Sequence, residues 1–177
     1  MSLLTYELAR PWAVAIREEV LARRMPPWPA VPGYGEFKNH VGLSAQEISI
    51  VANWVEGGAP EGEPEFLPAY SLPARPVSKP ALGATLLVAA GFKLARPLSI
   101  NAIQLRTGPA DKQIKIRAVL PDGSVQPLAW LLPLAGPERK RQLQYQNPVT
   151  LPAGSAIEIE PATGAQFALI VVPSPKR

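Results

Sequence analysis

The side chains that could take part in chemistry in this sequence are few: one histidine, two methionines and four tryptophans beside the ordinary acids and bases. The absence of cysteine excludes disulfides, thiolate metal sites and cysteine nucleophiles from these 177 residues. The single histidine, His40, cannot by itself form a three-histidine metal site or a histidine-based catalytic centre. The residue types therefore predict neither a complete catalytic set nor a complete metal-ligand set.

Met25 and the tryptophans have competing interpretations. A methionine at a helix end commonly fills a hydrophobic core. Trp12, Trp28 and Trp54 are large enough to build the core of a small helical module, and the same rings could wall a cofactor pocket or form a sugar platform. His40 lies in a predicted loop without neighbours of complementary chemistry, which indicates a surface or capping histidine.

Two helices are predicted to position these residues. The first covers residues 6–24, with a break near Arg10 imposed by Pro11. Thr5 is expected to cap this helix, and Met25-Pro26-Pro27-Trp28 ends it, because the residue before a proline avoids the helical region. The apolar stripe expected to be buried recurs at every fourth position and consists of Leu8, Trp12, Ile16 and Val20.

The second helix has a clear start and a clear end. Ser44-Ala45-Gln46-Glu47 matches a capping box, in which each terminal side chain binds the backbone N–H of the other residue. Gly57-Gly58 can supply the left-handed residue that commonly ends a helix. Residues 29–43, between the two helices, are predicted to form a loop. The face expected to be buried consists of Ile48, Val51 and Val55.

The second half of the sequence has a different character. Residues 61–80 are rich in proline, glutamate and alanine and predict a semi-stiff linker. Short apolar or alternating runs follow, separated by proline and glycine turns, which is typical of an antiparallel β-sandwich. The fold class is α+β by segment: helical residues 1–60, the linker, and a jelly-roll-like sandwich of residues 81–177. The predicted strands are residues 85–90, 98–105, 114–120, 125–132, 156–159 and 167–172.

Charge and hydropathy exclude several kinds of partner. Residues 66–177 carry thirteen Lys and Arg against five Asp and Glu, but these cations are scattered apart from Arg139-Lys140-Arg141. No run of aromatics lies among them for base stacking, so a solvated surface is expected rather than a nucleic-acid site. No apolar run reaches the length of a membrane span. The first residues do not form a signal peptide, because Glu7 and Arg10 interrupt their apolar stretch.

Residues 2–64 contain four short segments that are rich in tryptophan, proline and glycine. In chain order they are Arg10-Pro11-Trp12, Met25-Pro26-Pro27-Trp28, Gly33-Tyr34-Gly35 and Trp54-Val55-Glu56-Gly57-Gly58. This combination resembles a class of bacterial c-type cytochrome module. In that family the module often precedes a domain similar to the copper type II, ascorbate-dependent monooxygenases. The second half resembles that domain more weakly. The residues that carry this second resemblance are Ala118–Gly123, Pro127–Trp130 and Tyr145–Gly154.

The resemblance implies haem-linked electron transfer in the periplasm, with Met25 as the distal haem ligand and Trp12 and Trp28 as walls of the haem pocket. The family's attachment motif, two cysteines followed by a histidine, would lie just before Ser2. Covalent haem c needs those thiols and that histidine, so the chain is expected to be a truncated or split member that does not bind haem covalently alone.

No copper is expected in the sandwich, because the sequence departs there from the pattern of the resembling family. Relatives often place a histidine pair where this sequence has Arg106-Thr107-Gly108, and type II copper needs imidazole or thioether ligands. Loss of both cofactor sets leaves a second interpretation open, in which the sandwich is a non-catalytic module that binds a protein or a polysaccharide. The expected partner of the helical part is another protein or a missing N-terminal segment.

Overall fold

The computed structural model describes residues 3–38, 40–66, 81–134, 136–162 and 164–172. The chain divides into two compact units, which are called here the helical unit (residues 1–28 and 41–78) and the sandwich unit (residues 29–40 and 79–177). The helical part followed by an antiparallel sandwich confirms the predicted fold class. Most of the predicted linker 61–80 lies outside the described residues. Every helix in the described ranges falls short of the length and apolar character that a membrane crossing requires.

The first predicted helix forms in three pieces, α1 (Tyr6–Ala9), the 3₁₀ turn η1 (Arg10–Trp12) and α2 (Ala13–Leu21). Pro11 lies in η1, so the predicted break near Arg10 is confirmed. Thr5 is the N-cap residue of α1, but its side chain makes no capping hydrogen bond to the backbone. Thr5 is therefore at the predicted N-cap position, without the side-chain hydrogen bond that an N-cap threonine commonly makes.

The second predicted helix is α3 (Ala45–Glu56), and its capping box is confirmed. The backbone N–H of Glu47 donates to Oγ of Ser44 at 3.2 Å, and the backbone N–H of Ser44 donates to Oε2 of Glu47 at 2.8 Å. Gly58 has φ +87°, the left-handed value expected after the helix. After α3, Trp54 donates from Nε1 to the carbonyl of Pro60 at 2.9 Å. A short 3₁₀ turn, η2 (Pro64–Phe66), follows.

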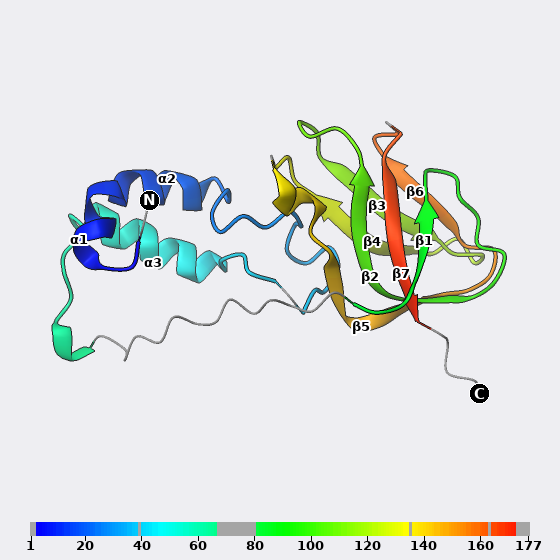
Figure 1. The fold of residues 1–177 in the computed structure, drawn as a ribbon, viewed down its shortest axis with the longest axis horizontal. Helices are drawn as coiled ribbons and strands as arrows, with labels where there is room; N and C mark the ends of the chain where they lie inside the picture. The colour runs from blue at the N-terminus through cyan, green and yellow to red at the C-terminus, as the bar shows by residue number, and fades with distance from the viewer. Residues whose placement is uncertain (1–2, 39, 67–80, 135, 163, 173–177) are drawn as a thin grey trace. The chain divides into compact units, whose positions relative to one another are not determined.

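Helices α2 and α3 lie side by side and bury little of their apolar surface (Figure 1). An ion pair joins them, from Nη2 of Arg17 to Oε1 of Glu56 at 2.6 Å. Of the predicted apolar stripe only Val20 is buried, Ile16 is half-buried, and Leu8 and Trp12 are exposed. The residues of the predicted face of α3 are only half-buried, and no residue of that helix is fully buried. Two helices alone do not offer enough neighbouring surface to cover both stripes.

The sandwich unit consists of two antiparallel sheets that face each other (Figure 1). One sheet has the order β1-β7-β2-β5 and the other the order β4-β3-β6. The strands are β1 (Ala84–Val88), β2 (Leu98–Thr107), β3 (Ile114–Val119), β4 (Val125–Leu131), β5 (Leu143–Leu151), β6 (Ala156–Glu160) and β7 (Gln166–Val172).

This strand order is that of a jelly roll in which one strand beside β6 is irregular. The segment between β1 and β2 takes that place, since Lys93 forms an isolated bridge with Ala156. Gly91 donates to the carbonyl of Ile157 at 2.8 Å, and Ile157 donates to that of Phe92 at 2.7 Å. The jelly-roll-like prediction is therefore confirmed. The interior between the sheets is made of fully buried side chains that include Ile103, Ile116, Leu128, Ile157, Phe167 and Leu169.

The residues of Pro29–His40 belong to the sandwich and are called here the strap. The sequence placed this segment in the helical module as a loop, but it pairs with the edge strands of both sheets. Ala30 bridges Leu131 of β4, and Phe37 bridges Tyr145 of β5. The strap therefore closes the side of the sandwich where β4 and β5 are the outermost strands.

Candidate functional site

Met25 lies just after α2 and is 52% exposed. It is therefore not the core filler that methionine at a helix end commonly provides. Its thioether sulfur belongs to the helical unit, together with the tryptophans of the predicted haem pocket. Of those, Trp12 is 49% exposed and Trp28 is only 5% exposed. The three predicted site residues thus lie in one unit but in different environments.

The helical unit exposes many more large apolar side chains than the sandwich does. Ten of its described residues fall in this class, against three in the sandwich unit, which are Leu82, Leu87 and Val125. These apolar side chains are ones that the two main helices of the unit do not cover. The ten residues, called here the apolar set, are Leu3, Leu4, Leu8, Trp12, Val14, Leu21, Met25, Val41, Ile50 and Phe66.

These 177 residues do not by themselves fit a c-type haem. They contain no cysteine for the thioether bonds, and the one histidine, His40, is an exposed residue of the strap in the sandwich unit. Within the described ranges, no group of three or more His, Cys, Asp or Glu side chains is placed to hold a metal ion. The thiols and the proximal imidazole of such a haem would have to come from another polypeptide segment.

Arg106, from the segment where the sequence resemblance led us to expect no copper ligand, is an exposed residue of β2. Its Nη1 donates to Oε1 of Gln104 at 3.0 Å, and Gln104 in turn donates to the carbonyl of Lys140 at 2.7 Å. A guanidinium has no lone pair to give to copper. The side chains at this position form a surface hydrogen-bond chain instead.

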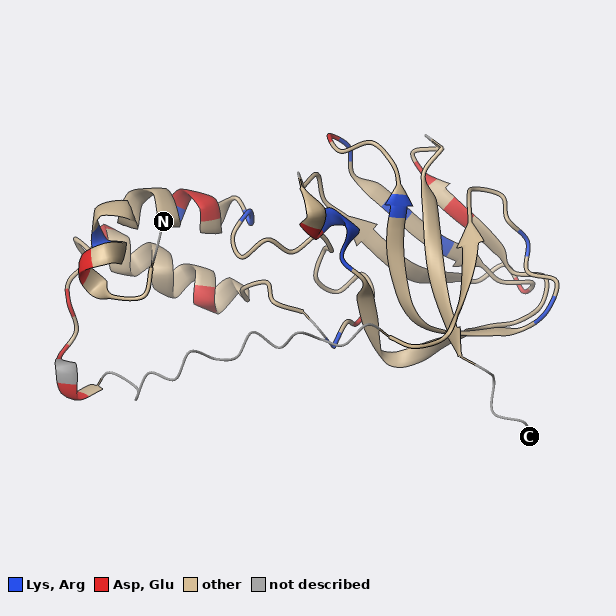
Figure 2. Ribbon diagram, in the orientation of Figure 1, with Lys and Arg blue, Asp and Glu red and all other residues tan. Residues whose placement is uncertain are grey.

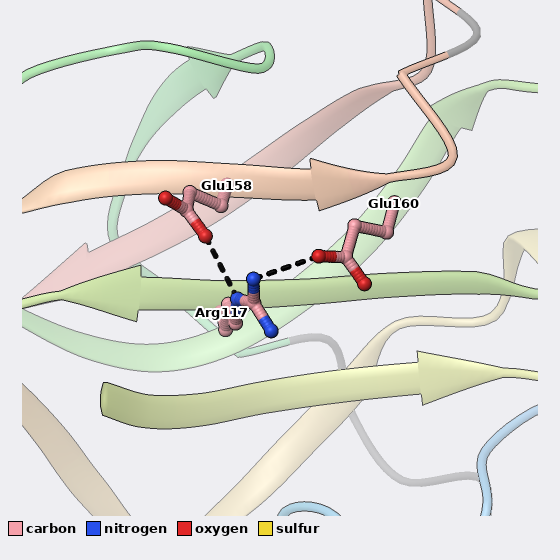
Figure 3. A network of polar contacts seen from close by, with 3 residues as sticks. All are labelled: Arg117, Glu158 and Glu160. Carbon is pink, nitrogen blue, oxygen red and sulfur yellow. Dashed lines mark hydrogen bonds and ion pairs between the residues drawn. The ribbon is translucent and has the colours of Figure 1, made fainter.

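A cluster of ion pairs lies on the outer face of the β4-β3-β6 sheet. Arg117 of β3 donates from Nε to Oε2 of Glu158 at 2.8 Å and from Nη2 to Oε1 of Glu160 at 2.7 Å (Figure 3). The hydrogen bond that Arg117 donates to Glu158 raises the pKa of Arg117, and the charge of Glu160 raises it further. Because Lys115 and Arg117 alternate with buried isoleucines, the predicted half-exposed character of β3 is confirmed.

Aromatic side chains continue this outer face toward the strap. The ammonium of Lys115 lies 4.0 Å from the centroid of the Trp130 ring, a cation–π contact. Tyr34 of the strap meets the same ring edge-on at a centroid distance of 5.8 Å. Trp130 also donates from Nε1 to Oε1 of Gln113 at 3.1 Å. Burial raises the pKa of Tyr34, so its hydroxyl is protonated and can serve as a donor.

Among the described cations of the sandwich unit, Arg139 is the one that is buried rather than solvated as expected. It lies in the 3₁₀ turn η3 (Pro137–Lys140) and is 5% exposed. Burial lowers its pKa, although the charge of Asp111 opposes that effect. Nη1 donates to the carbonyls of Ala110 and Leu132 at 2.6 and 3.2 Å, and Nη2 to those of Pro109 and Lys112 at 2.5 and 2.7 Å. The guanidinium thus holds the β2–β3 loop in place.

Sequence reasoning missed the strap and the Arg139 clamp. Gly33-Tyr34-Gly35 did mark a loop, but the pairing of this loop with distant strands leaves no local signal. A basic run such as Arg139-Lys140-Arg141 gives no sign of which member is buried. No protein-family model matches this chain, and no curated protein is similar enough in sequence to count as a relative.

Proposed function

We propose that the helical unit is one part of a cytochrome c-type electron-transfer module and docks a haem-bearing polypeptide segment through its apolar set. The observation that carries this proposal is the exposure of that set on a unit with two main helices. Burial of apolar surface contributes roughly 25 cal/mol per Å², so a covering segment stabilises the unit. The nature of the segment comes from the resemblance of residues 2–64 to c-type cytochrome modules.

Met25 is the residue of this chain that offers a ligand atom to such a segment. Its side chain is exposed, and the residue lies beyond the last turn of α2, where the backbone no longer follows the helix. A thioether raises the reduction potential of haem iron when it binds there. The exposed Leu21, at the end of the same helix, would help to exclude water from the contact.

A haem peptide that carries its own two cysteines and proximal histidine, with the sixth iron position open, tests this function. Titration with the purified chain is expected to give saturable low-spin absorption and a higher reduction potential, because the Met25 sulfur occupies the open position. The matched controls are Met25→Leu, which keeps the apolar surface but removes the sulfur, and Met1→Leu, which removes the other methionine.

The expected order is a full spectral change with the unmodified chain and with Met1→Leu, and none with Met25→Leu. Trp12→Lys places a charge in the apolar set and is expected to weaken the titration without abolishing the low-spin end point. An unmodified chain that leaves the haem peptide's spectrum unchanged at saturating concentration would contradict the proposal. The same change with Met25→Leu would also contradict it.

A second candidate function is favoured by the outer face of the β4-β3-β6 sheet. There the strap adds Tyr34 to a surface that already holds Trp130, Lys115 and the Arg117 ion pairs. Aromatic and charged groups of both signs suit a non-catalytic binding module for a protein or polysaccharide. This function is supported if the unmodified chain and Met25→Leu bind a protein or polysaccharide and Trp130→Ala does not. Met25→Leu is the control, since Met25 belongs to the other unit.

A further inference from the structure

The four outermost strands of the two sheets, β1, β5, β4 and β6, differ in how their free edges are protected. The strap covers β4, where Val31 donates to the carbonyl of Trp130 at 2.8 Å, and β5, where Lys38 donates to that of Gln144 at 2.9 Å. The segment between β1 and β2 covers the first part of β6. Glu158 and Glu160 add charge to the rest of β6. Covering segments and charges are the usual means by which proteins prevent pairing at sheet edges.

β1 has none of these protections among the described residues. It pairs with β7 on one side, and its other side makes no backbone hydrogen bond within the described ranges. The strand consists of Ala84-Thr85-Leu86-Leu87-Val88 and includes no charge and no proline. Figure 2 accordingly shows it in tan, without blue or red. Leu87 is 56% exposed, and Leu82, just before the strand, is 88% exposed. An uncharged, apolar edge strand of this kind is a template for a further strand.

We propose that the free edge of β1 pairs antiparallel with β1 of a second copy of this chain. The pair would join two β1-β7-β2-β5 sheets into one continuous sheet across a two-fold axis. The absence of charge favours this occupant, because a two-fold axis puts two copies of the same strand side by side, and like charges on the two copies would repel. A partner of different sequence would find no charged residue on this strand to select it.

We place the two-fold axis at Leu86, the central residue of β1, and this sets the register of the paired strands. With Leu86 on the two-fold axis, Leu87 of one copy lies opposite Thr85 of the other. Both side chains are on the outer face of the sheet, because their partners in β7 are Ala168 and Ile170, which belong to the outer-face cluster with Ala102. Pairing would therefore extend that apolar cluster across the junction of the two sheets. A strand of five residues makes a small contact, so the dimer is expected to be weak and concentration-dependent.

Sedimentation equilibrium of the full chain up to about 1 mM tests the proposal. The unmodified chain is expected to show a monomer–dimer equilibrium. Leu87→Lys is expected to raise the dissociation constant at least about tenfold, because a cation then lies at the paired edge. The matched control is Val125→Lys, since Val125 is 52% exposed on β4 of the other sheet, and it is expected to leave the equilibrium unchanged.

Adding Thr85→Glu to Leu87→Lys tests the register, because it places opposite charges across the two-fold axis and is expected to restore the dimer. A chain that stays monomeric at the highest concentration overturns the proposal and leaves this edge to an extended segment of another protein. A dimer that Leu87→Lys does not weaken, or that the second substitution does not restore, overturns it as well. The haem-peptide titration is independent of these results, because it uses the helical unit.

Discussion

The hydroxyl of Tyr145 on β5 donates a 2.9 Å hydrogen bond to the carbonyl oxygen of Leu128 on β4, and so ties the two sheets together through the buried interior. The ring of Tyr145 also packs against Phe37 of the strap, at a centroid distance of 5.1 Å. One side chain therefore joins both sheets and the segment that closes them. The strap is in this sense a part of the sandwich core, although the chain enters it directly from the helical unit.

Tyr145→Phe is expected to reduce the free energy of unfolding by about 1–3 kcal/mol, because it leaves the buried carbonyl of Leu128 without this donor. Urea unfolding followed by tryptophan fluorescence measures the change. Tyr34→Phe is the matched control, since it removes a hydroxyl from the tyrosine of the strap, which is only half-buried. Equal losses in the two variants would contradict the role given to the Tyr145 hydrogen bond.

Tyr145 also predicts a dependence of stability on alkaline pH. Complete burial raises its pKa in the folded chain well above the usual value of about 10. Above pH 10 the unfolded chain loses this proton while the folded chain keeps it, so the stability conferred by the group falls as pH rises. The drop in the unfolding midpoint between about pH 9 and 11 is expected to be smaller in Tyr145→Phe than in the unmodified chain. An identical drop in both would contradict this origin.

Gly35 allows the strap to pass closely over β4. A Cβ atom at this position would lie 2.7 Å from the carbonyl oxygen of Leu128 and 2.8 Å from Cζ of Phe37, and φ is +93°. Gly35→Ala is therefore expected to cost about 2–4 kcal/mol of unfolding free energy. Gly33→Ala is the control, because φ there is +80° but nothing lies within 4 Å of the added atom. Its expected cost is about 1–2 kcal/mol, from backbone strain alone.

Thermal unfolding of both glycine variants measures the difference. A cost for Gly35→Ala no larger than that for Gly33→Ala would show that the strap is free to move away from β4. Since the strap covers the β4 and β5 edges, a loosened strap is also expected to increase hydrogen exchange at Val31 and Lys38, whose N–H groups donate to those strands.

The parts of this fold that could be predicted from sequence are those with local signals. The capping box of Ser44 and Glu47, the break at Pro11 and the turn after Val119 each depend on residues a few positions apart. Six of the seven strands follow from alternation and turn residues for the same reason. β5 was not among the predicted strands, and Pro148 interrupts the run of residues that forms it. The proline is tolerated there, because β5 is an outermost strand and its register against β2 shifts near this point.

The rest depends on contacts between distant residues. Periodicity predicted that Leu8 and Trp12 point toward a core, but it could not show that the neighbouring surface needed to cover them is missing from the helical unit. The strap pairs residues about one hundred positions apart, such as Ala30 with Leu131 and Phe37 with Tyr145. No pattern within residues 29–43 specifies those partners. The sequence could show which residue types might form a site, but it could not show which of them are exposed. The exposure of Met25, for example, is a property of the folded unit.

Arg139 provides a final test of a feature that only the structure shows. Arg139→Lys keeps the charge but cannot donate to four carbonyls in two directions, because the planar guanidinium fork is lost. It is expected to lower the free energy of unfolding by about 2–3 kcal/mol and to loosen the β2–β3 loop. Arg141→Lys is the matched control, since Arg141 makes a partly exposed ion pair with Glu138, and is expected to cost below about 1 kcal/mol.

Urea unfolding and limited proteolysis at Lys112 check the two effects of Arg139→Lys separately. Lys112 lies in the loop that Arg139 holds, and its own carbonyl accepts from Nη2. Faster trypsin cleavage after Lys112 in Arg139→Lys, but not in Arg141→Lys, is the result that follows from the clamp. If the two variants unfold and are cleaved alike, the buried guanidinium contributes no more than a surface ion pair, and the loop is held by its other contacts.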